Sequence, residues 1–235
     1  KIAGVGRSMR GVLVTLEDGT EIAGSHVLFA TGRAPNTDKL NLAAVGLETD
    51  SRGYVPTDAK LRTKVPNLWA LGDVNRRGAF THTSYHDHEI VLADLDKIKD
   101  RYQWKDADQR PTTYAMFTDP PLGRVGLSRT EARKLAAEGR NILIADMKMA
   151  DISRAKEESE TTGLIRIIVD GDSEAILGAT VFGIAGDEII AIFSNFMATG
   201  ASYKIMQQAL PVHPTVAELI PTILAGLTPL AAGNA

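Results

Sequence analysis

The chain has 235 residues, of which 44% are hydrophobic and 23% are charged, as is typical of a globular protein with one large domain or two ordinary ones. Its net charge of -3 gives no electrostatic reason to expect nucleic acid or an anionic membrane as a partner. The absence of cysteine excludes disulfides, thiolate metal sites and a thiol nucleophile within these residues. No charged-then-apolar leader follows Lys1, so no signal peptide is predicted and a cytoplasmic location is expected.

The first predicted element is a hairpin. Residues 11–17 and 21–29 are typical of two strands, and Asp18 and Gly19 between them form a common hairpin turn. The second strand ends in small residues, including Gly32, which suit a chain that passes close to a ligand.

The middle of the chain predicts few regular elements. Residues 34–62 are expected to be rich in loops. The apolar run 67–71 predicts a short strand of the buried parallel kind. A helix is predicted over 81–99, and the polar stretch 102–110 predicts a domain boundary because it has no periodicity.

The rest of the chain predicts strands with segregated helices, which is typical of an α+β domain. Its strands are expected at 112–117, 142–149, 163–170 and 175–182. After the first strand, a capping box from Ser128 to Glu131 opens a helix that Gly139 closes. A second helix over 186–199 carries a wide apolar stripe, which indicates burial on two sides, as in a subunit interface.

His213 and Glu218 have a spacing that allows two interpretations. A histidine can exchange protons close to neutral pH, a carboxylate partner selects its tautomer, and Pro214 restricts the backbone beside it. The run from Thr215 to Glu218 also fits a capping box, in which the carboxylate merely serves a helix start. Spacing alone favours the cap, but it does not exclude the acid–base pair, and both interpretations remain open.

A cluster of histidines raises a metal site as a further alternative. His82, His86 and Glu89 fall at positions i, i+4 and i+7, on one face of the predicted helix. No cysteine assists them and no fourth ligand is evident, although structural zinc sites usually have four ligands. A solvated helix face is therefore favoured, and no metal site is predicted.

Four motifs occur in order and together resemble a known family. They are Ala30-Thr31-Gly32-Arg33-Ala34-Pro35-Asn36, then Thr63 to Asp73 with its Asn67-Leu68-Trp69-Ala70-Leu71-Gly72-Asp73 ending, then Phe117-Thr118-Asp119-Pro120 with Val125-Gly126-Leu127-Ser128, and last His213-Pro214-Thr215-x-x-Glu218. This order is similar to the C-terminal half of the pyridine nucleotide–disulfide oxidoreductases, the family of dihydrolipoamide dehydrogenase and glutathione reductase.

The resemblance implies an α/β part followed by an α+β dimerisation domain with an antiparallel sheet and helices. Residues 1–29 would be the last strands of an NAD(P)-binding domain, 30–108 the C-terminal part of an FAD-binding domain, and 109–235 the dimerisation domain. The implied cofactors are FAD and NAD(P)H. The implied partners are a second copy of the chain in a homodimer, the upstream portion of the same protein with its cysteine pair, and a small thiol or disulfide substrate.

The resemblance also implies roles for single residues. His213 would be the catalytic acid–base residue, with Glu218 bound to its far nitrogen. Gly32 and Arg33 would lie on the NAD(P) side, although Arg33 is equally well explained as a surface charge. The residues implied in the FAD site are Gly72, Asp73, Ala79, Phe80, Thr81 and His82.

The expected function is therefore that of an FAD-dependent NAD(P)H:disulfide oxidoreductase, of which this chain would be the C-terminal portion. One alternative is a non-catalytic dimerisation module, in which the histidine and glutamate are only a cap. Another is a flavin reductase with an acceptor other than a disulfide.

Overall fold

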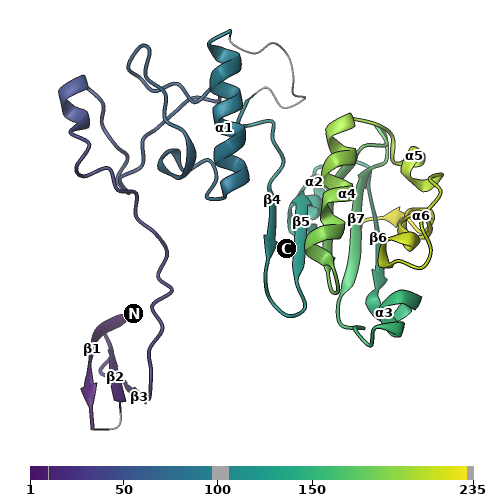
Figure 1. The fold of residues 1–235 in the computed structure, drawn as a ribbon, viewed down its shortest axis with the longest axis horizontal. Coiled ribbons are helices and arrows are strands. Elements are labelled where there is room, and N and C mark those ends of the chain that lie inside the picture. The colour runs from purple at the N-terminus through teal and green to yellow at the C-terminus, as the bar shows by residue number, and fades with distance from the viewer. Residues whose placement is uncertain (10, 97–105, 232–235) are drawn as a thin grey trace.

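Three parts follow one another along the chain in Figure 1: a small N-terminal sheet, a loop-rich segment with one long helix, and a larger sheet covered by helices. The computed structural model describes residues 1–9, 11–96 and 106–231. Within these ranges, no helix has the length and apolar character needed to cross a membrane.

The N-terminal sheet is a three-stranded antiparallel meander. Its strands, in sheet order, are β1 (Ile2–Ser8), β2 (Gly11–Leu16) and β3 (Glu21–Gly24). Pairing of β2 with β3 confirms the predicted hairpin, and Gly19 takes a positive φ of 84° in the turn between them. The second strand is shorter than predicted, because residues 25–34 pair with no strand in the described part of the chain.

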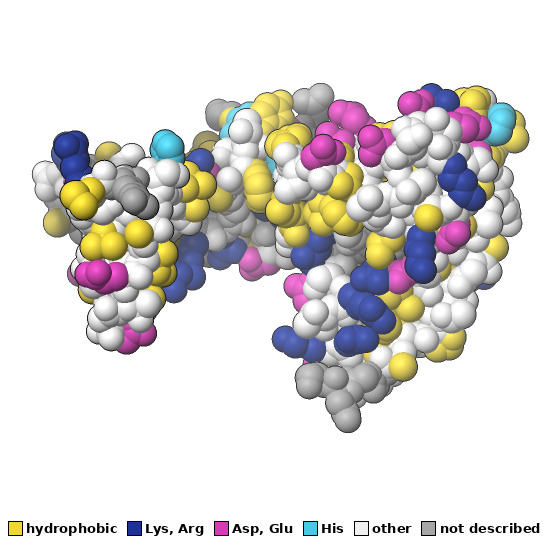
Figure 2. All heavy atoms as spheres, turned by 90° about the horizontal axis from the view of Figure 1, so that it is seen from below, with side chains coloured by type: hydrophobic (Ala, Val, Ile, Leu, Met, Phe, Trp, Pro, Cys, Tyr) yellow, Lys and Arg dark blue, Asp and Glu magenta, His cyan; other side chains and the backbone are white. Residues whose placement is uncertain are grey.

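None of the described residues in the three strands of this sheet is buried. Every residue of β3 is exposed, and exposed apolar side chains on the sheet include Ile2, Val5 and Ile22 (Figure 2, left). Small sheets become stable when an apolar face packs against further structure, so these strands are suited to completing a larger domain.

The middle part confirms the predicted loops and helix but not the predicted strand. Helix α1 (Thr81–Asp94) begins where expected and ends early, and residues 97–99 of the predicted helix lie outside the described residues. Residues 67–71 are not a strand, because among the described residues only one isolated bridge forms there, between Arg62 and Trp69. An apolar run becomes a strand only where neighbouring strands satisfy its backbone groups.

The large sheet has six strands and is antiparallel throughout. Its order is β4-β5-β8-β7-β6-β9. The strands are β4 (Thr113–Met116), β5 (Leu122–Gly126), β6 (Ile142–Lys148), β7 (Leu164–Asp170), β8 (Ile176–Phe182) and β9 (Thr228–Pro229). The four predicted strands are present, whereas β5 and the short β9 were not predicted.

Helices cover both faces of this sheet (Figure 1). They are α2 (Arg129–Ala137), α3 (Ser153–Glu157), α4 (Gly186–Thr199), α5 (Tyr203–Gln207) and α6 (Ile220–Ala225). Ile167 of β7 packs in the cluster that contains α4, and the next residue, Ile168, packs in the cluster that contains α2. Alternate side chains of a strand point to opposite faces, so one strand serves both cores.

The capping box that was predicted for α2 is confirmed. The Glu131 backbone N–H donates to Ser128 Oγ at 3.2 Å, and the Ser128 N–H donates to the Glu131 carboxylate at 2.7 Å. The Ser128 hydroxyl also donates to the Glu131 carboxylate at 2.6 Å, and this hydrogen bond, followed by the one from the Ser128 N–H, lowers the pKa of Glu131. The start of α2 is thus fixed by local sequence.

Asp170, at the end of β7, is expected to make a pH-dependent contribution to the stability of the fold. It is buried, and its Oδ1 accepts the N–H groups of Ser173 at 3.0 Å and Asp172 at 3.1 Å while Arg140 pairs with the other oxygen. The Ser173 hydrogen bond is the largest cause of the lowered pKa of Asp170.

A pKa lowered on folding means that the ionised carboxylate stabilises the fold above the unfolded value of about 3.9, and that this stabilisation is lost as the pH falls through the folded value. Asp170→Asn is expected to lower the free energy of unfolding at pH 7 by about 1 kcal/mol. Urea unfolding of the two proteins at pH 7 and at about pH 3 measures this difference. An equal difference at both pH values would contradict it.

Candidate active site

His213 and Glu218 meet as an oriented pair. His213 lies in the loop after α5, and Glu218 lies in the 3-10 turn Val216–Leu219. The distance between His213 Nδ1 and Glu218 Oε2 is 2.8 Å. The histidine side chain is 76% exposed and the glutamate side chain only 11%. If the Nδ1–H group donates to the carboxylate, Nε2 is the nitrogen left to exchange a proton with another molecule.

Glu218 makes the contact that each of the two interpretations requires. Glu218 Oε2 also accepts the Thr215 backbone N–H at 3.3 Å, as a capping glutamate does. The Thr215 hydroxyl instead donates to the Val212 carbonyl at 2.7 Å, which closes the loop that carries the histidine. The cap therefore fixes the carboxylate in the place from which it orients the imidazole.

The loop around His213 exposes apolar side chains. Leu210 and Val212 precede the histidine and are exposed. Large apolar side chains on a surface are typical of an interaction site when they lie together. The loop is therefore suited to contact with further protein.

A cavity of about 590 Å³ brings three of the predicted segments together. Its lining includes Arg33 from the first motif, Asp73 from the second and Ala79 before α1. Arg33 Nη1 lies 3.7 Å from Asp73 Oδ2, and both side chains are exposed. Segments 40 residues apart in sequence thus form the walls of one cavity that contains both a cation and a carboxylate.

The two predicted glycines stand beside this cavity in strained backbone. Gly32 has a φ of 91° and Gly72 a φ of 74°, which side chains other than glycine rarely adopt. A Cβ on Gly72 would also lie 3.0 Å from the Ser84 hydroxyl oxygen. At both positions the backbone conformation itself favours glycine.

Phe80, Thr81 and His82 lie at the start of α1 and do not line the cavity. The Phe80 ring stacks on the His82 ring at a centroid distance of 5.2 Å and on the Tyr114 ring at 6.0 Å. His82 Nε2 lies 2.7 Å from the Thr113 carbonyl oxygen. These residues connect the start of α1 to β4, and a flavin role for them stays a prediction.

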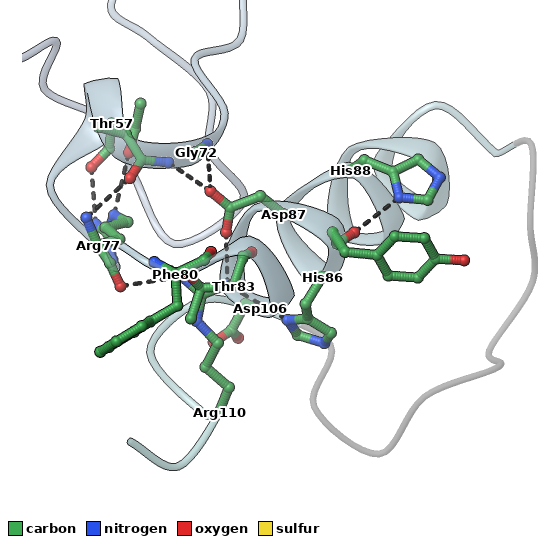
Figure 3. Close-up of polar contacts among 12 residues, drawn as sticks. Thr57, Gly72, Arg77, Phe80, Thr83, His86, Asp87, His88, Asp106 and Arg110 are labelled. Atoms are coloured by element: carbon green, nitrogen blue, oxygen red, sulfur yellow. Dashed lines mark hydrogen bonds and ion pairs between the residues drawn. The ribbon is translucent and has the colours of Figure 1, made fainter. Parts of the chain in front are cut away.

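A buried ion pair that sequence analysis missed lies next to Gly72 (Figure 3). Asp87 of α1 pairs with Arg110, and the same carboxylate accepts the Gly72 backbone N–H. Arg110 belongs to the polar stretch 102–110 that was predicted as a boundary, of which residues 102–105 lie outside the described residues. The sequence carried one indication that Asp87 is buried. The apolar Ile90 lies three residues later on the same helix face, and the structure shows Ile90 buried.

Two family descriptions match the sequence. "Pyridine nucleotide-disulphide oxidoreductase" matches residues 1–87, and "Pyridine nucleotide-disulphide oxidoreductase, dimerisation domain" matches residues 112–223. The chain belongs to this family. The predicted resemblance is confirmed, as is the fold class of an α/β part followed by an α+β dimerisation domain. Members of the family use FAD and NAD(P)H.

Curated relatives in the family are about twice as long as the chain. The probable pyridine nucleotide-disulfide oxidoreductase RclA of Escherichia coli is 31% identical over 198 residues, which are 84% of this chain and 44% of the relative. The dihydrolipoyl dehydrogenase of Halobacterium salinarum is 34% identical over 215 residues, 88% of this chain and 43% of the relative. The Bacillus subtilis dihydrolipoyl dehydrogenase is 30% identical over 219 residues, 92% and 45% respectively. The chain thus spans about half the length of these relatives.

Two solved structures share the fold. The HOCl-induced flavoprotein disulfide reductase RclA from E. coli superposes with a TM-score of 0.83 at 29% identity, covering 96% of this chain and 50% of that one. LpdA from Mycobacterium tuberculosis gives a TM-score of 0.84 at 22% identity over 96% and 48% of the two chains, a likeness of fold.

The metal alternative finds no support in the part of the chain that the structure describes. That part holds no group of three or more His, Cys, Asp or Glu side chains arranged to bind a metal ion. His82 contacts the Thr113 carbonyl, and His88 Nδ1 lies 2.7 Å from the Tyr85 carbonyl oxygen. The spacing of the histidines on α1 therefore does not translate into convergent ligands.

Proposed function

We propose that this member of the family is the C-terminal portion of an FAD-dependent NAD(P)H:disulfide oxidoreductase. It would supply the acid–base pair, one wall of the flavin site and a dimer contact. The observation that carries the proposal is the 2.8 Å contact between His213 Nδ1 and Glu218 Oε2, with the imidazole largely exposed. An exposed imidazole held by a largely covered carboxylate suits proton transfer to a group that another segment delivers.

The residues of the cavity fit a flavin nucleotide. The Asp73 carboxylate would accept hydrogen bonds from hydroxyl groups of the ribityl chain, and Gly72 would let the backbone approach closely. Arg33 would balance the charge of the site from the NAD(P) side. Bound FAD would supply two-electron transfer from NAD(P)H to a disulfide.

His213 would manage the protons of thiol–disulfide exchange. Reduction of a disulfide releases a thiolate, and protonation of that thiolate by Nε2–H completes the step; in the reverse direction Nε2 accepts the thiol proton. Glu218 accepts Nδ1–H throughout, so it holds the tautomer and stabilises the charged ring. Acid–base assistance of this kind contributes about 10²–10⁴-fold in rate.

The cysteines for this reaction would come from outside these residues, since the chain contains none. We assign them to the upstream portion of the same protein, together with the nucleotide-binding loops. The exposed apolar loop around His213 would dock on a second copy of the chain, as the dimerisation-domain match suggests, and present the imidazole to the cysteines of that copy.

Purified full-length protein tests the proposal. We expect one FAD per subunit, a dimeric mass, and oxidation of NADH or NADPH that depends on a small disulfide. FAD binding with oxidation supported only by a quinone would instead identify a flavin reductase with another acceptor. A dimer without FAD and without NAD(P)H oxidation would identify a non-catalytic dimerisation module.

A further inference from the structure

Asp87 and Arg110 form a buried ion pair, and Asp87 contacts the turn Gly72–Asn75, which carries Asp73 (Figure 3). The side chain of Asp87 is 1% exposed and that of Arg110 is 9% exposed. Taking two ions out of water is costly, and a buried pair is tolerated only where further hydrogen bonds satisfy its remaining groups. The segments that provide those hydrogen bonds show what the pair holds in place.

Asp87 fixes both ends of one turn. Its Oδ2 accepts the Gly72 backbone N–H and the Asn75 side-chain amide, each at 2.8 Å. Gly72 and Asn75 are the first and last residues of the 3-10 turn Gly72–Asn75, which contains Asp73. A single carboxylate oxygen therefore sets the position of the turn against α1.

Arg110 fixes the distance between this turn and the start of the helix. Its Nη1 donates to Asp87 Oδ1 at 2.5 Å and to the Thr83 carbonyl in the first turn of α1 at 3.1 Å. Its Nη2 donates to the Arg77 carbonyl, just beyond the 3-10 turn, at 3.0 Å. The planar guanidinium thus joins three backbone or side-chain acceptors across the segment that precedes α1.

We propose that Asp87 and Arg110 are positioning residues for the flavin. They hold Asp73 and the first turn of α1 at the separation that bound FAD requires, and they act through the backbone because both side chains are buried. The inference rests on the proposed function. The carboxylate is required, because an amide at this position would turn its NH₂ group toward one of three existing donors.

Asp87→Asn in FAD-loaded full-length protein tests this role. We expect the dissociation constant of FAD to rise about tenfold or more, since a charge-assisted hydrogen bond is lost behind the site, and the visible absorption bands of bound FAD to shift. Asp170→Asn is the matched control. Asp170 is a second buried carboxylate that accepts backbone N–H groups and pairs with an arginine, but it lies at the end of β7. The control is expected to lose stability and keep the wild-type FAD affinity and spectrum.

Arg110→Lys gives a second route if Asp87→Asn does not fold. Lysine keeps a positive charge beside Asp87 but lacks the second arm that reaches the Arg77 carbonyl, so the same changes are expected in milder form. Wild-type affinity and spectrum in the folded variant, or equal changes in Asp170→Asn, would overturn the positioning role while leaving the proposed function intact. Absence of FAD from the wild-type protein would overturn the proposed function itself.

Discussion

Replacing His213 by Gln in the full-length protein is expected to slow disulfide-dependent turnover at least about a hundredfold. Glutamine occupies similar space and can still hydrogen-bond, but it neither accepts nor releases a proton near neutral pH. The Glu218 carboxylate would keep its capping contact with the Thr215 N–H, so the loop should retain its fold. The effect should therefore fall on the chemistry and not on stability.

Two rapid-mixing measurements locate this effect. Reduction of bound FAD by NAD(P)H should proceed at the wild-type rate, whereas the transfer of electrons from the reduced enzyme to the disulfide substrate should be slow. His88→Gln is the control, because His88 lies on α1 and its ring contacts the Tyr85 carbonyl and the Tyr85 ring, not the proposed pair. Wild-type turnover of the His213 variant, or an equal loss in the control, would argue for the dimerisation module.

Replacing Phe193 by Ala is expected to destabilise the dimerisation domain by about 3–5 kcal/mol. The ring is fully buried on α4, in the cluster that also contains Val125 of β5 and Val181 of β8. Removing it leaves a cavity between helix and sheet that close-packed neighbours fill only in part. A loss of this size is a large fraction of the stability of an ordinary domain.

Ile192→Ala supplies the comparison for this variant. Ile192 precedes Phe193 on the same helix and is 42% exposed, so its truncation is expected to cost less than about 1 kcal/mol. Urea unfolding followed by circular dichroism measures both, and gel filtration reports whether the dimer persists. Equal losses in the two variants would show that α4 is not packed on the sheet as described.

Local patterns in the sequence were enough for much of the dimerisation domain. The capping box at Ser128 and the apolar stripe of α4 both depend on neighbouring residues, and both predicted their elements correctly. These features need no knowledge of distant contacts, because propensity and periodicity determine them.

Elements that depend on distant partners were missed. Strand β5 contains Gly123, where a Cβ would lie 2.2 Å from the Gly186 carbonyl oxygen of α4, so glycine serves helix packing there and hides the strand pattern. The run 67–71 read as a strand but finds no neighbouring strand in the described residues. Asp87 and Arg110, 23 residues apart, form a pair that no local pattern indicates.

The candidate site was predictable to a similar degree. The contact of His213 with Glu218 was implied by the family resemblance, whereas the spacing of five residues alone could not choose between a cap and an acid–base pair. The structure shows one carboxylate oxygen that binds both the imidazole and the Thr215 N–H. The common cavity of Arg33 and Asp73 required the folded chain.

The most direct test is a crystal structure of the full-length protein with FAD bound, in which the distance from His213 Nε2 to the nearest cysteine sulfur is measured. We expect that distance to be within hydrogen-bonding range, with the sulfur on a second subunit and Glu218 still bound to Nδ1. An imidazole that faces bulk solvent in the assembled protein, with no sulfur within reach, would contradict the proposed role.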